Sequence, residues 1–296
     1  TRGTFEVRFL RDGVQVIREI NPAEVGQCGG AIPIPEAAAG ATPPAEPGPD
    51  GDGAGQRDSG STIDVLVVYT SAARIAEGGT TAMQALIAAS IADVNLRHDN
   101  SVTGVQFRLV GRGEVDYAET GSSSTDLSRL RDPDDSHMDI VHAWRNTYAA
   151  DVVTLILDTM DSGIAGLGYR PSTLSQMNDA SYAFSVVRRT YADDGTMAHE
   201  IGHNLGCHHH PDDDSGGGPA SGDAVIFPYA FGHRFYAGWW FRTTMAYDPT
   251  GLHVRVDYFS DPDDTYNGQP LGIDGERDNA AVIRQTRTAM ANHRQS

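Results

Sequence analysis

Residues 198–210, AHEIGHNLGCHHH, contain five of the eleven histidines in the chain, together with a glutamate and a cysteine. His199 and His203 are four residues apart, so on a helix their imidazoles lie on one face and can hold a single ion. Imidazole is a good zinc ligand at neutral pH because it is uncharged and moderately soft. Glu200 lies at the edge of the same face, where it can reach a water on the ion without binding the metal itself.

A catalytic zinc ion needs a third protein ligand and an open fourth position. Gly206 can adopt the left-handed conformation that ends a helix, and three residues later His209 can return to the metal. HExxH alone also occurs on ordinary solvated helices, but the longer pattern HExxHxxGxxH fixes five positions and is rare by chance. We expect His208 and His210 to face solvent.

This residue set predicts amide hydrolysis. Three imidazoles and one water complete a tetrahedral zinc site, and the ion lowers the pKa of the water towards ~7. Glu200 then takes the proton as the water attacks a carbonyl group, and passes it to the leaving amine.

The segments around the motif alternate between strand and helix patterns. Strands alternating with helices imply a mostly parallel sheet with crossover helices. Apolar runs predict strands over residues 62–70, 104–117, 151–158, 162–170 and 181–189. Helical spacing predicts helices over residues 80–98, 136–149 and 276–292. Their inward residues are predicted to be Met83, Ile87, Ile91 and Val94; then Ile140, Val141, Trp144 and Tyr148; then Val282, Ile283, Thr286 and Met290.

The N-terminal part has a different composition. Residues 1–30 contain two alternating runs on either side of Asp12-Gly13, which predicts a hairpin, and we interpret this segment as the remnant of a propeptide. Residues 31–60 contain six prolines and six glycines, too many chain breakers for a core, so we expect a flexible linker that proteases can cut. The catalytic domain then spans residues 61–296.

The chain is strongly acidic, with a formal net charge of −18, and all of its Lys+Arg residues are arginines. This charge argues against nucleic acid or anionic membranes as partners. No apolar run approaches the ~18 residues that would span a bilayer. We expect a secreted, extracellular monomer, although the codon preference of the genome is an alternative explanation for the arginine bias.

The motif resembles that of the metzincin zinc endopeptidases at every fixed position. The segments HEIGHNLG, GIAGLGY and TMAYDP are most similar to the reprolysin-like branch, especially bacterial secreted members that resemble peptidyl-Asp metalloendopeptidases. The similarity covers roughly residues 62–294. Two departures are that His210 replaces the usual aspartate after the third histidine, and that two cysteines cannot supply the disulfides of reprolysins.

The resemblance implies an α+β fold with two subdomains, at about residues 61–206 and 207–296. The upper subdomain would hold a twisted, mostly parallel sheet with an antiparallel edge strand, together with two long helices. The lower subdomain would be irregular, with a Met-turn and a terminal helix, and the cleft would run between the two. A polypeptide substrate would lie in this cleft in an extended conformation.

The resemblance also suggests roles for two residues downstream of the motif. Met245 stands where the Met-turn methionine lies beneath the zinc ion. Tyr247 is at the spacing where some metzincins place a tyrosine near the zinc or the oxyanion, to which a phenol can donate a hydrogen bond. An ordinary packed tyrosine is the alternative.

The edge strand of the family binds substrate through antiparallel main-chain hydrogen bonds. The matching segment comprises Gly163, Ile164, Ala165, Gly166, Leu167 and Gly168. Glycines permit close approach of another backbone, although a loosely packed loop would have the same composition.

Cys28 lies before the predicted linker, in the sequence GQCGG. Thiolate is an excellent zinc ligand, so Cys28 could occupy the open zinc position and keep the enzyme latent, as in the cysteine switch of some metzincin zymogens. A Cys28–Cys207 disulfide and a free thiol are the alternatives.

Two further features bear on ligands. An aspartate-preferring pocket would need a buried cation, for which Arg242, Arg255 and Arg234 are candidates, although we expect each to lie on the surface. The acidic loops at residues 211–217 and 260–268 have the oxygen ligands that Ca²⁺ prefers, but such runs are usually solvated.

The sequence thus predicts a secreted zinc metalloendopeptidase. One alternative is a catalytically silent binding module of the same fold, but such modules often lose the general base, and Glu200 is present. Another is a zinc amidohydrolase acting on a small substrate, which an open edge strand disfavours.

Overall fold

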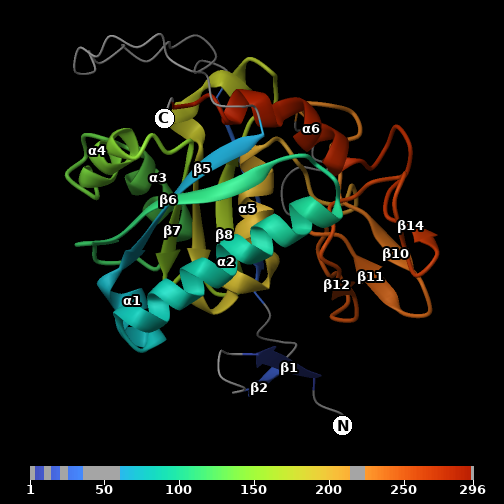
Figure 1. Ribbon diagram of the computed structural model, residues 1–296, viewed down its shortest axis with the longest axis horizontal. Helices are drawn as coiled ribbons and strands as arrows, with labels where there is room; N and C mark the ends of the chain where they lie inside the picture. The colour runs from blue at the N-terminus through green and yellow to red at the C-terminus, as the bar shows by residue number, and fades with distance from the viewer. Residues whose placement is uncertain (1–3, 10–14, 21–25, 36–60, 214–223, 295–296) are drawn as a thin grey trace.

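The computed structural model describes residues 4–9, 15–20, 26–35, 61–213 and 224–294 (Figure 1). A sheet of seven strands forms the centre, in the order β3-β8-β9-β7-β5-β6, with β4 also paired to β8. The strands are β3 (Gln27–Cys28), β4 (Ile32–Pro33), β5 (Thr62–Thr70), β6 (Gln106–Val115), β7 (Val152–Leu157), β8 (Ile164–Arg170) and β9 (Phe184–Arg188).

The strand directions agree with the prediction of a mostly parallel sheet. β6, β5, β7 and β9 run parallel, whereas β8 runs antiparallel to β9. The five predicted strands are present, β5 with the predicted bounds and the other four with shorter ends. However, β8 is not a free edge, because β3 and β4 pair with it in the parallel direction.

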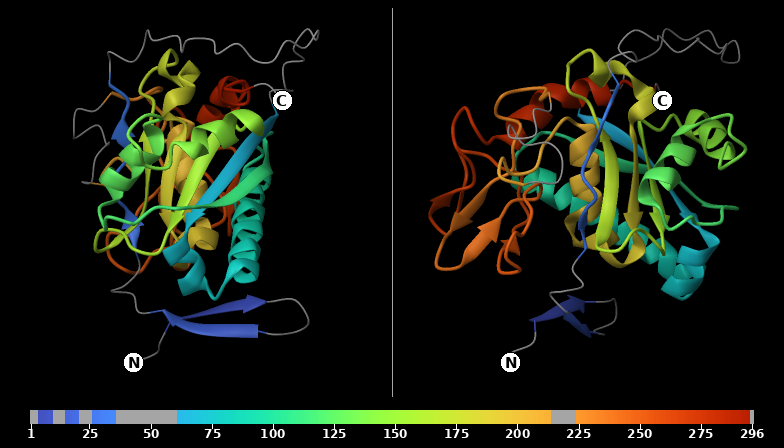
Figure 2. Two further views of the ribbon diagram at one scale, coloured as in Figure 1. Left: turned by 90° about the vertical axis from the view of Figure 1, so that its left-hand side faces the viewer. Right: turned by 180° about the vertical axis from the view of Figure 1, so that it is seen from behind.

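Alternation along β5 places helices on both faces of the sheet. Ile63, Val65 and Val67 belong to one apolar cluster with residues of α2, α5 and α6, whereas Leu66 and Val68 belong to a second cluster with α3 and α4. In Figure 2 (left) the sheet lies between α2 (cyan) and the green helices α3 and α4. The helices are α1 (Ser71–Glu77), α2 (Thr80–Asn100), α3 (Ser123–Arg131), α4 (Ile140–Thr147), α5 (Met197–Asn204) and α6 (Asn279–Met290).

The inward faces of α2 and α6 are confirmed, because all eight of their predicted apolar positions are buried. The predicted face of α4 is wrong at two positions: Ile140 is 52% exposed and Tyr148 is 44% exposed. Val141 faces inward as predicted, and Arg145, which was not predicted, faces inward beside it. Arg145 donates hydrogen bonds to the carbonyl oxygens of Ala150, Ala180 and Asp151. An arginine whose hydrogen bonds are satisfied can therefore be buried at a position that an apolar pattern does not predict to be inward.

Helix lengths also depart from expectation. The resemblance implies two long helices. α2 is long, with 21 residues, but α5, which carries the metal motif, has only eight. Within the described residues, no helix combines the length and apolar composition needed to cross a membrane.

The C-terminal part is largely irregular and lies beside the sheet (Figure 1). It contains the three-stranded sheet β10-β11-β12 and the short pair β13-β14, and α6 returns to the main apolar cluster. The strands are β10 (Arg234–Tyr236), β11 (Trp240–Arg242), β12 (Val254–Arg255), β13 (Thr265–Tyr266) and β14 (Gln269–Pro270).

The N-terminal segment confirms the hairpin and corrects the linker. β1 (Thr4–Phe9) pairs antiparallel with β2 (Gln15–Ile20), apart from the layered body in Figure 1. Residues 31–35 are not linker: Ile32 pairs with Tyr169, and Ile34 is 5% exposed within an apolar cluster. The rest of the predicted linker, residues 36–60, lies outside the described residues.

Candidate metal centre

Helix α5 places His199, Glu200 and His203 in the interior of the protein. Every residue of this helix is buried, because one side packs on the sheet and the other meets the C-terminal part. Met245 lies in a turn closed by the bond from Ala246 N to Thr243 O (3.1 Å). A Cβ added at Gly202 would lie 2.7 Å from Met245 Sδ, so Met245 packs directly against the motif helix.

The helix ends as the glycine predicts. Gly206 has φ 95°, a left-handed conformation that costs glycine little. Its N–H donates to His203 O (2.8 Å), and Cys207 N–H donates to Gly202 O (3.0 Å), which together form a Schellman motif. The reversal returns the chain so that His209 reaches the other two histidines.

Three imidazole nitrogens and one sulfur converge on one point. His209 Nε2 is 3.1 Å from His199 Nε2 and 2.8 Å from His203 Nε2, and Cys28 Sγ is 3.5 Å from His203 Nε2. On a tetrahedral zinc ion, ligand nitrogens would lie about 3.3 Å apart and nitrogen and sulfur about 3.5 Å apart. The four side chains therefore fit a tetrahedral metal site, and they are buried.

Backbone carbonyls orient two of the imidazoles. Nδ1 of His199 lies 2.8 Å from Thr244 O, and Nδ1 of His203 lies 2.8 Å from Cys207 O. With Nδ1–H donating to these carbonyls, Nε2 is left as the metal ligand in each ring. Burial lowers the pKa of all three histidines, to about 3 for His203, so the rings are neutral, as ligation requires.

Glu200 lies beside the metal position but is not one of the four converging groups. It is fully buried, and within the described residues Oε1 has no hydrogen-bond partner. Burial raises the pKa of Glu200 to about 8. An orphaned buried carboxylate oxygen at this place fits a site that holds a metal ion and a water.

Tyr247 reaches the same site from the segment after Met245. Its ring centroid is 4.1 Å from that of His209, and its hydroxyl donates a hydrogen bond to Cys28 O (2.8 Å). The phenol is therefore aimed at a carbonyl group next to the metal position, rather than packed in an unrelated part of the core.

Cys28 and Cys207 are both free and buried, so the disulfide alternative is wrong. Cys207 Sγ contacts Asn279 O at 3.7 Å, whereas Cys28 Sγ is 3.6 Å from Glu200 Oε2. Burial and the nearby Glu200 charge raise the pKa of the Cys28 thiol. A cation at the centre of the three histidines would offset both effects and favour the thiolate.

The segment that carries Cys28 lies along β8, as Figure 2 (right) shows in blue. Gln27 N–H donates to Gly163 O and Gly29 N–H donates to Gly166 O, both at 2.8 Å. This segment runs parallel to β8, opposite to the direction expected for substrate. The predicted strand is thus present, and the N-terminal segment of the chain itself pairs with it.

Two expectations about solvent exposure are wrong. His208 is 1% exposed and His210 is 5% exposed. His208 contacts the buried Arg170, and His210 contacts Arg234. A histidine pattern alone does not reveal these arginine partners, since they lie far away in the sequence.

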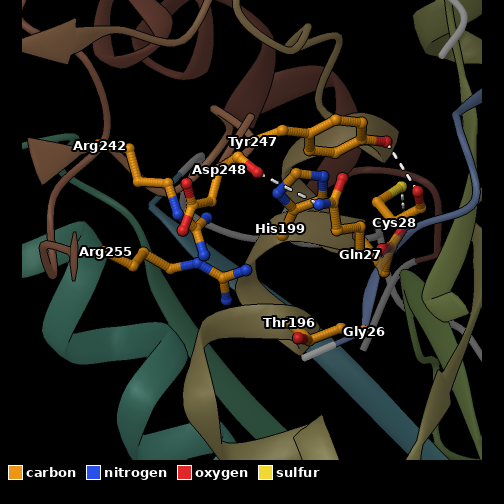
Figure 3. A pocket seen from close by; sticks show the side chains of 10 residues that line it. Gly26, Gln27, Cys28, Thr196, His199, Arg242, Tyr247, Asp248 and Arg255 are labelled. Atoms are coloured by element: carbon orange, nitrogen blue, oxygen red, sulfur yellow. Dashed lines mark hydrogen bonds between the residues drawn. The ribbon is translucent and has the colours of Figure 1, made fainter. Parts of the chain in front are cut away.

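The arginine candidates also differ from expectation. Arg242 is buried and Arg255 is largely buried, and both line a pocket beside the metal position (Figure 3). Arg234 is also largely buried, with its side chain 11% exposed, but it forms an ion pair with Asp213 (2.7 Å). The sequence does not reveal which of the three arginines lies beside the metal position, because they occur in short strands without a repeating apolar pattern.

The acidic loops give no support for calcium. Asp213 pairs with Arg234, and Asp261 pairs with Arg284 at 3.0 Å. Among the described residues, the histidine and cysteine cluster is the one group placed to hold a metal ion. Residues 214–217 lie outside the described residues.

Comparison with known proteins adds a family to this geometry. Residues 59–260 match the reprolysin-type model of metallo-peptidase family M12. The chain is 38% identical over 251 residues to a peptidyl-Asp metalloendopeptidase of Stenotrophomonas maltophilia (strain R551-3), covering 81% of this chain and 55% of that protein. A protein of the same name from Xanthomonas campestris pv. campestris is 36% identical over 241 residues, covering 80% and 54%.

Two other comparisons concern length and fold. A Pseudomonas fragi protein, also named peptidyl-Asp metalloendopeptidase, is 30% identical over 202 residues and is covered to 96% of its length. The chain thus spans about half the length of the Stenotrophomonas and Xanthomonas relatives but nearly all of this one. A solved structure described as a chaperone-substrate complex matches with a TM-score of 0.62 at 20% identity, covering 80% of this chain and 35% of that chain, which is a likeness of fold.

The family match agrees with the site reached from the residues, since it covers the whole HExxHxxGxxH motif and the turn at Met245. The chain belongs to metallo-peptidase family M12.

Proposed function

We propose that this chain is the catalytic part of a secreted zinc endopeptidase that hydrolyses internal peptide bonds. The observation that carries the proposal is the convergence of three oriented imidazole nitrogens beside a buried glutamate. Zinc, when bound there, supplies Lewis-acid polarisation of the scissile carbonyl and an acidified water. Its ligands would be His199, His203 and His209.

Glu200 is the proposed general base. Its Oε2 lies 3.6 Å from Cys28 Sγ, so this oxygen would face a water that takes the place of the thiol. A bound cation favours the carboxylate form of Glu200, which can then accept the proton of the attacking water. The buried surroundings that raise its pKa favour acceptance of that proton, and the protonated carboxyl group then passes it to the leaving amine.

Tyr247 is the proposed oxyanion donor. Its hydroxyl already donates to a carbonyl oxygen, that of Cys28, beside the metal position. A substrate carbonyl in the same place would receive this hydrogen bond, which strengthens as negative charge develops on the oxygen.

The N-terminal segment is the proposed inhibitor of the same site. Cys28 Sγ lies where a fourth zinc ligand belongs, and β3 and β4 cover the edge of β8. In this state neither water nor substrate has access. Cutting the chain between residues 36 and 60 would allow the segment to leave, and an extended substrate would then pair with β8 in the opposite direction.

The proposal extends to specificity, two subdomains and oligomeric state. The relatives are named for action at aspartate, and we extend that preference to this chain. The sheet-containing part would form the upper subdomain and residues from about 207 the lower one, with the metal between them. We expect a monomer, and no contact with nucleic acid or membrane.

Retention of Glu200 at the metal position argues against a silent binding module. The covered edge strand argues against a small amide as substrate, since main-chain pairing along a strand recognises a polypeptide.

Metal removal tests the function. In a Cys28→Ser chain, where the fourth position is free, a zinc chelator is expected to abolish casein hydrolysis, because the ligand histidines alone cannot activate a water. Adding about one equivalent of zinc should restore it, and magnesium should not. Zinc content is measured by mass spectrometry alongside the rate. Undiminished hydrolysis by metal-free protein would refute the proposal.

A Gly166→Ala substitution tests the position of Glu200. The added Cβ would lie 2.5 Å from Glu200 Oε1, so the carboxylate must shift from its place beside the metal position. We expect kcat to fall roughly 10- to 100-fold, as for a displaced general base, while zinc content stays the same.

The matched control is Gly111→Ala in β6, whose Cβ would lie 2.6 Å from Tyr148 Cδ2. This change creates a similar clash in the same sheet, far from the metal position. It should lower thermal stability without lowering kcat. An equal loss of kcat in both variants would show that Gly166 acts only through general stability.

A further inference from the structure

A pocket lies beside the metal position. Its lining includes Thr196, His199 and Glu200 from the motif helix and the residue before it, and Arg242 and Arg255 from the C-terminal part. Figure 3 shows the two arginine side chains converging on one side of His199, with Cys28 and Tyr247 on the other side. A substrate residue next to the scissile bond would place its side chain there.

Arg242 comes from the end of β11 and is 8% exposed. Its Nη1 donates to Ala246 O at 2.8 Å. Within the described residues its Nε has no hydrogen-bond partner, and no carboxylate lies within ion-pair distance. A guanidinium has five N–H donors, so most of the capacity of Arg242 is unused.

Arg255 comes from β12, and its side chain is 16% exposed. Its Nη1 donates to Asp194 O at 2.9 Å and lies 3.7 Å from Asp194 Oδ1. Its Nε also has no partner among the described residues. The contact with Asp194 fixes one end of the guanidinium and leaves other donors for the pocket.

The positive charges of Arg242 and Arg255 are not fully balanced by negative charge in the pocket. Burial, followed by repulsion from Arg255, lowers the pKa of Arg242, which means that its positive charge is costly in this state. Asp248 also lines the pocket, and its charge partly offsets the lowering of the Arg242 pKa. Its Oδ1, however, accepts hydrogen bonds from its own loop, at Thr250 N and Leu252 N (both 3.1 Å). An anion from outside would offset the cost of the buried cation.

The N-terminal segment does not supply that anion. Gln27, which lines the pocket with Cys28, is neutral, and its Nε2 donates to Asp248 O at 3.3 Å. The segment that blocks the metal thus supplies no carboxylate to either arginine.

We propose that Arg242 and Arg255 form a subsite that binds the side-chain carboxylate of an acidic substrate residue. The proposal rests on the function proposed above and identifies the residues that would give it specificity. Arg242 contributes the main charge-assisted hydrogen bonds, since it has no competing carboxylate, and Arg255 adds a second cation. A purely structural role, in which both arginines only hold backbone carbonyls, predicts no effect on ligand preference.

Peptide binding tests the subsite without catalysis. The protein is the chain with Cys28→Ser and Glu200→Gln, cut in its linker so that the covering segment can leave. The two substitutions free the fourth position and prevent cleavage. The ligands are a fluorescent peptide with one aspartate and the same peptide with asparagine, measured by anisotropy. The aspartate peptide is expected to bind at least about tenfold more tightly. Adding Arg242→Gln should remove most of this preference, and adding Arg255→Gln should remove part of it.

Arg234→Gln is the matched control, because Arg234 carries the same charge but already pairs with Asp213. It should leave the ratio of the two affinities unchanged, whatever it does to each. Three results would overturn the subsite. They are equal binding of both peptides by the Cys28→Ser, Glu200→Gln chain, no binding of either peptide, and a preference that survives both pocket substitutions. If one pocket variant fails to fold, as circular dichroism reveals, the other still tests the preference.

Hydrolysis of the same peptides by the Cys28→Ser chain separates the two proposals. Preferential binding without any hydrolysis would refute the endopeptidase function and leave the subsite standing. Hydrolysis of both peptides at equal rates would support the function and refute the subsite.

Discussion

A Glu200→Gln substitution in the Cys28→Ser chain is expected to lower kcat for peptide hydrolysis by roughly 10²- to 10⁴-fold, the usual contribution of a general base. Glutamine has nearly the same size but cannot accept the proton of the attacking water. Zinc content should not change, because Glu200 is not among the four groups that converge on the metal position. The measurement combines kcat from peptide cleavage with zinc content per chain.

Glu114→Gln is the control, because this substitution removes the same charge far from the metal. Glu114 lies in a surface ion pair with Arg74 (2.6 Å). It should leave kcat unchanged. If the Glu200 variant cleaves at the parent rate with full zinc, another group must activate the water and the mechanism proposed here is wrong.

The sequence predicts this centre well because its geometry is set locally. The four-residue spacing places His199 and His203 on one helix face, and Gly206 sets the reversal that returns His209. Each step depends on backbone geometry over a few residues. The alternating strands of the upper part are predicted for the same reason, since buried and exposed positions repeat along each strand.

Long-range packing accounts for what the sequence does not reveal. Burial of Arg242 and Arg255 depends on strands that form only when the C-terminal part folds against α5 and the segment before it. Residues 31–35 pack against β8, which lies more than 130 residues away in the sequence, since Ile32 pairs with Tyr169. Proline and glycine content predicts a linker there, because composition carries no information about a distant strand that accepts the segment.

The N-terminal segment also gives the second prediction of large effect. A Cys28→Ser substitution in the full chain is expected to raise peptide hydrolysis by about 10- to 100-fold, because a hydroxyl is a much weaker zinc ligand than a thiolate and no longer excludes water from the fourth position. Full activity is not expected, since Gln27 and Gly29 still pair with β8. The rate is compared with that of the parent after its linker has been cut.

Thiol titration gives an independent measurement of the same contact. In the parent, Cys28 should react slowly with a disulfide reagent while zinc is bound and faster after chelation, because the metal holds the thiolate. Cys207 is fully buried and should contribute nothing to the fast phase, so a Cys207→Ala chain should give the same fast phase as the parent. Equal reactivity of Cys28 with and without zinc, or equal hydrolysis by the parent and Cys28→Ser chains, would mean that the thiol does not bind the metal. The covering segment would then block the cleft through its strand pairing alone.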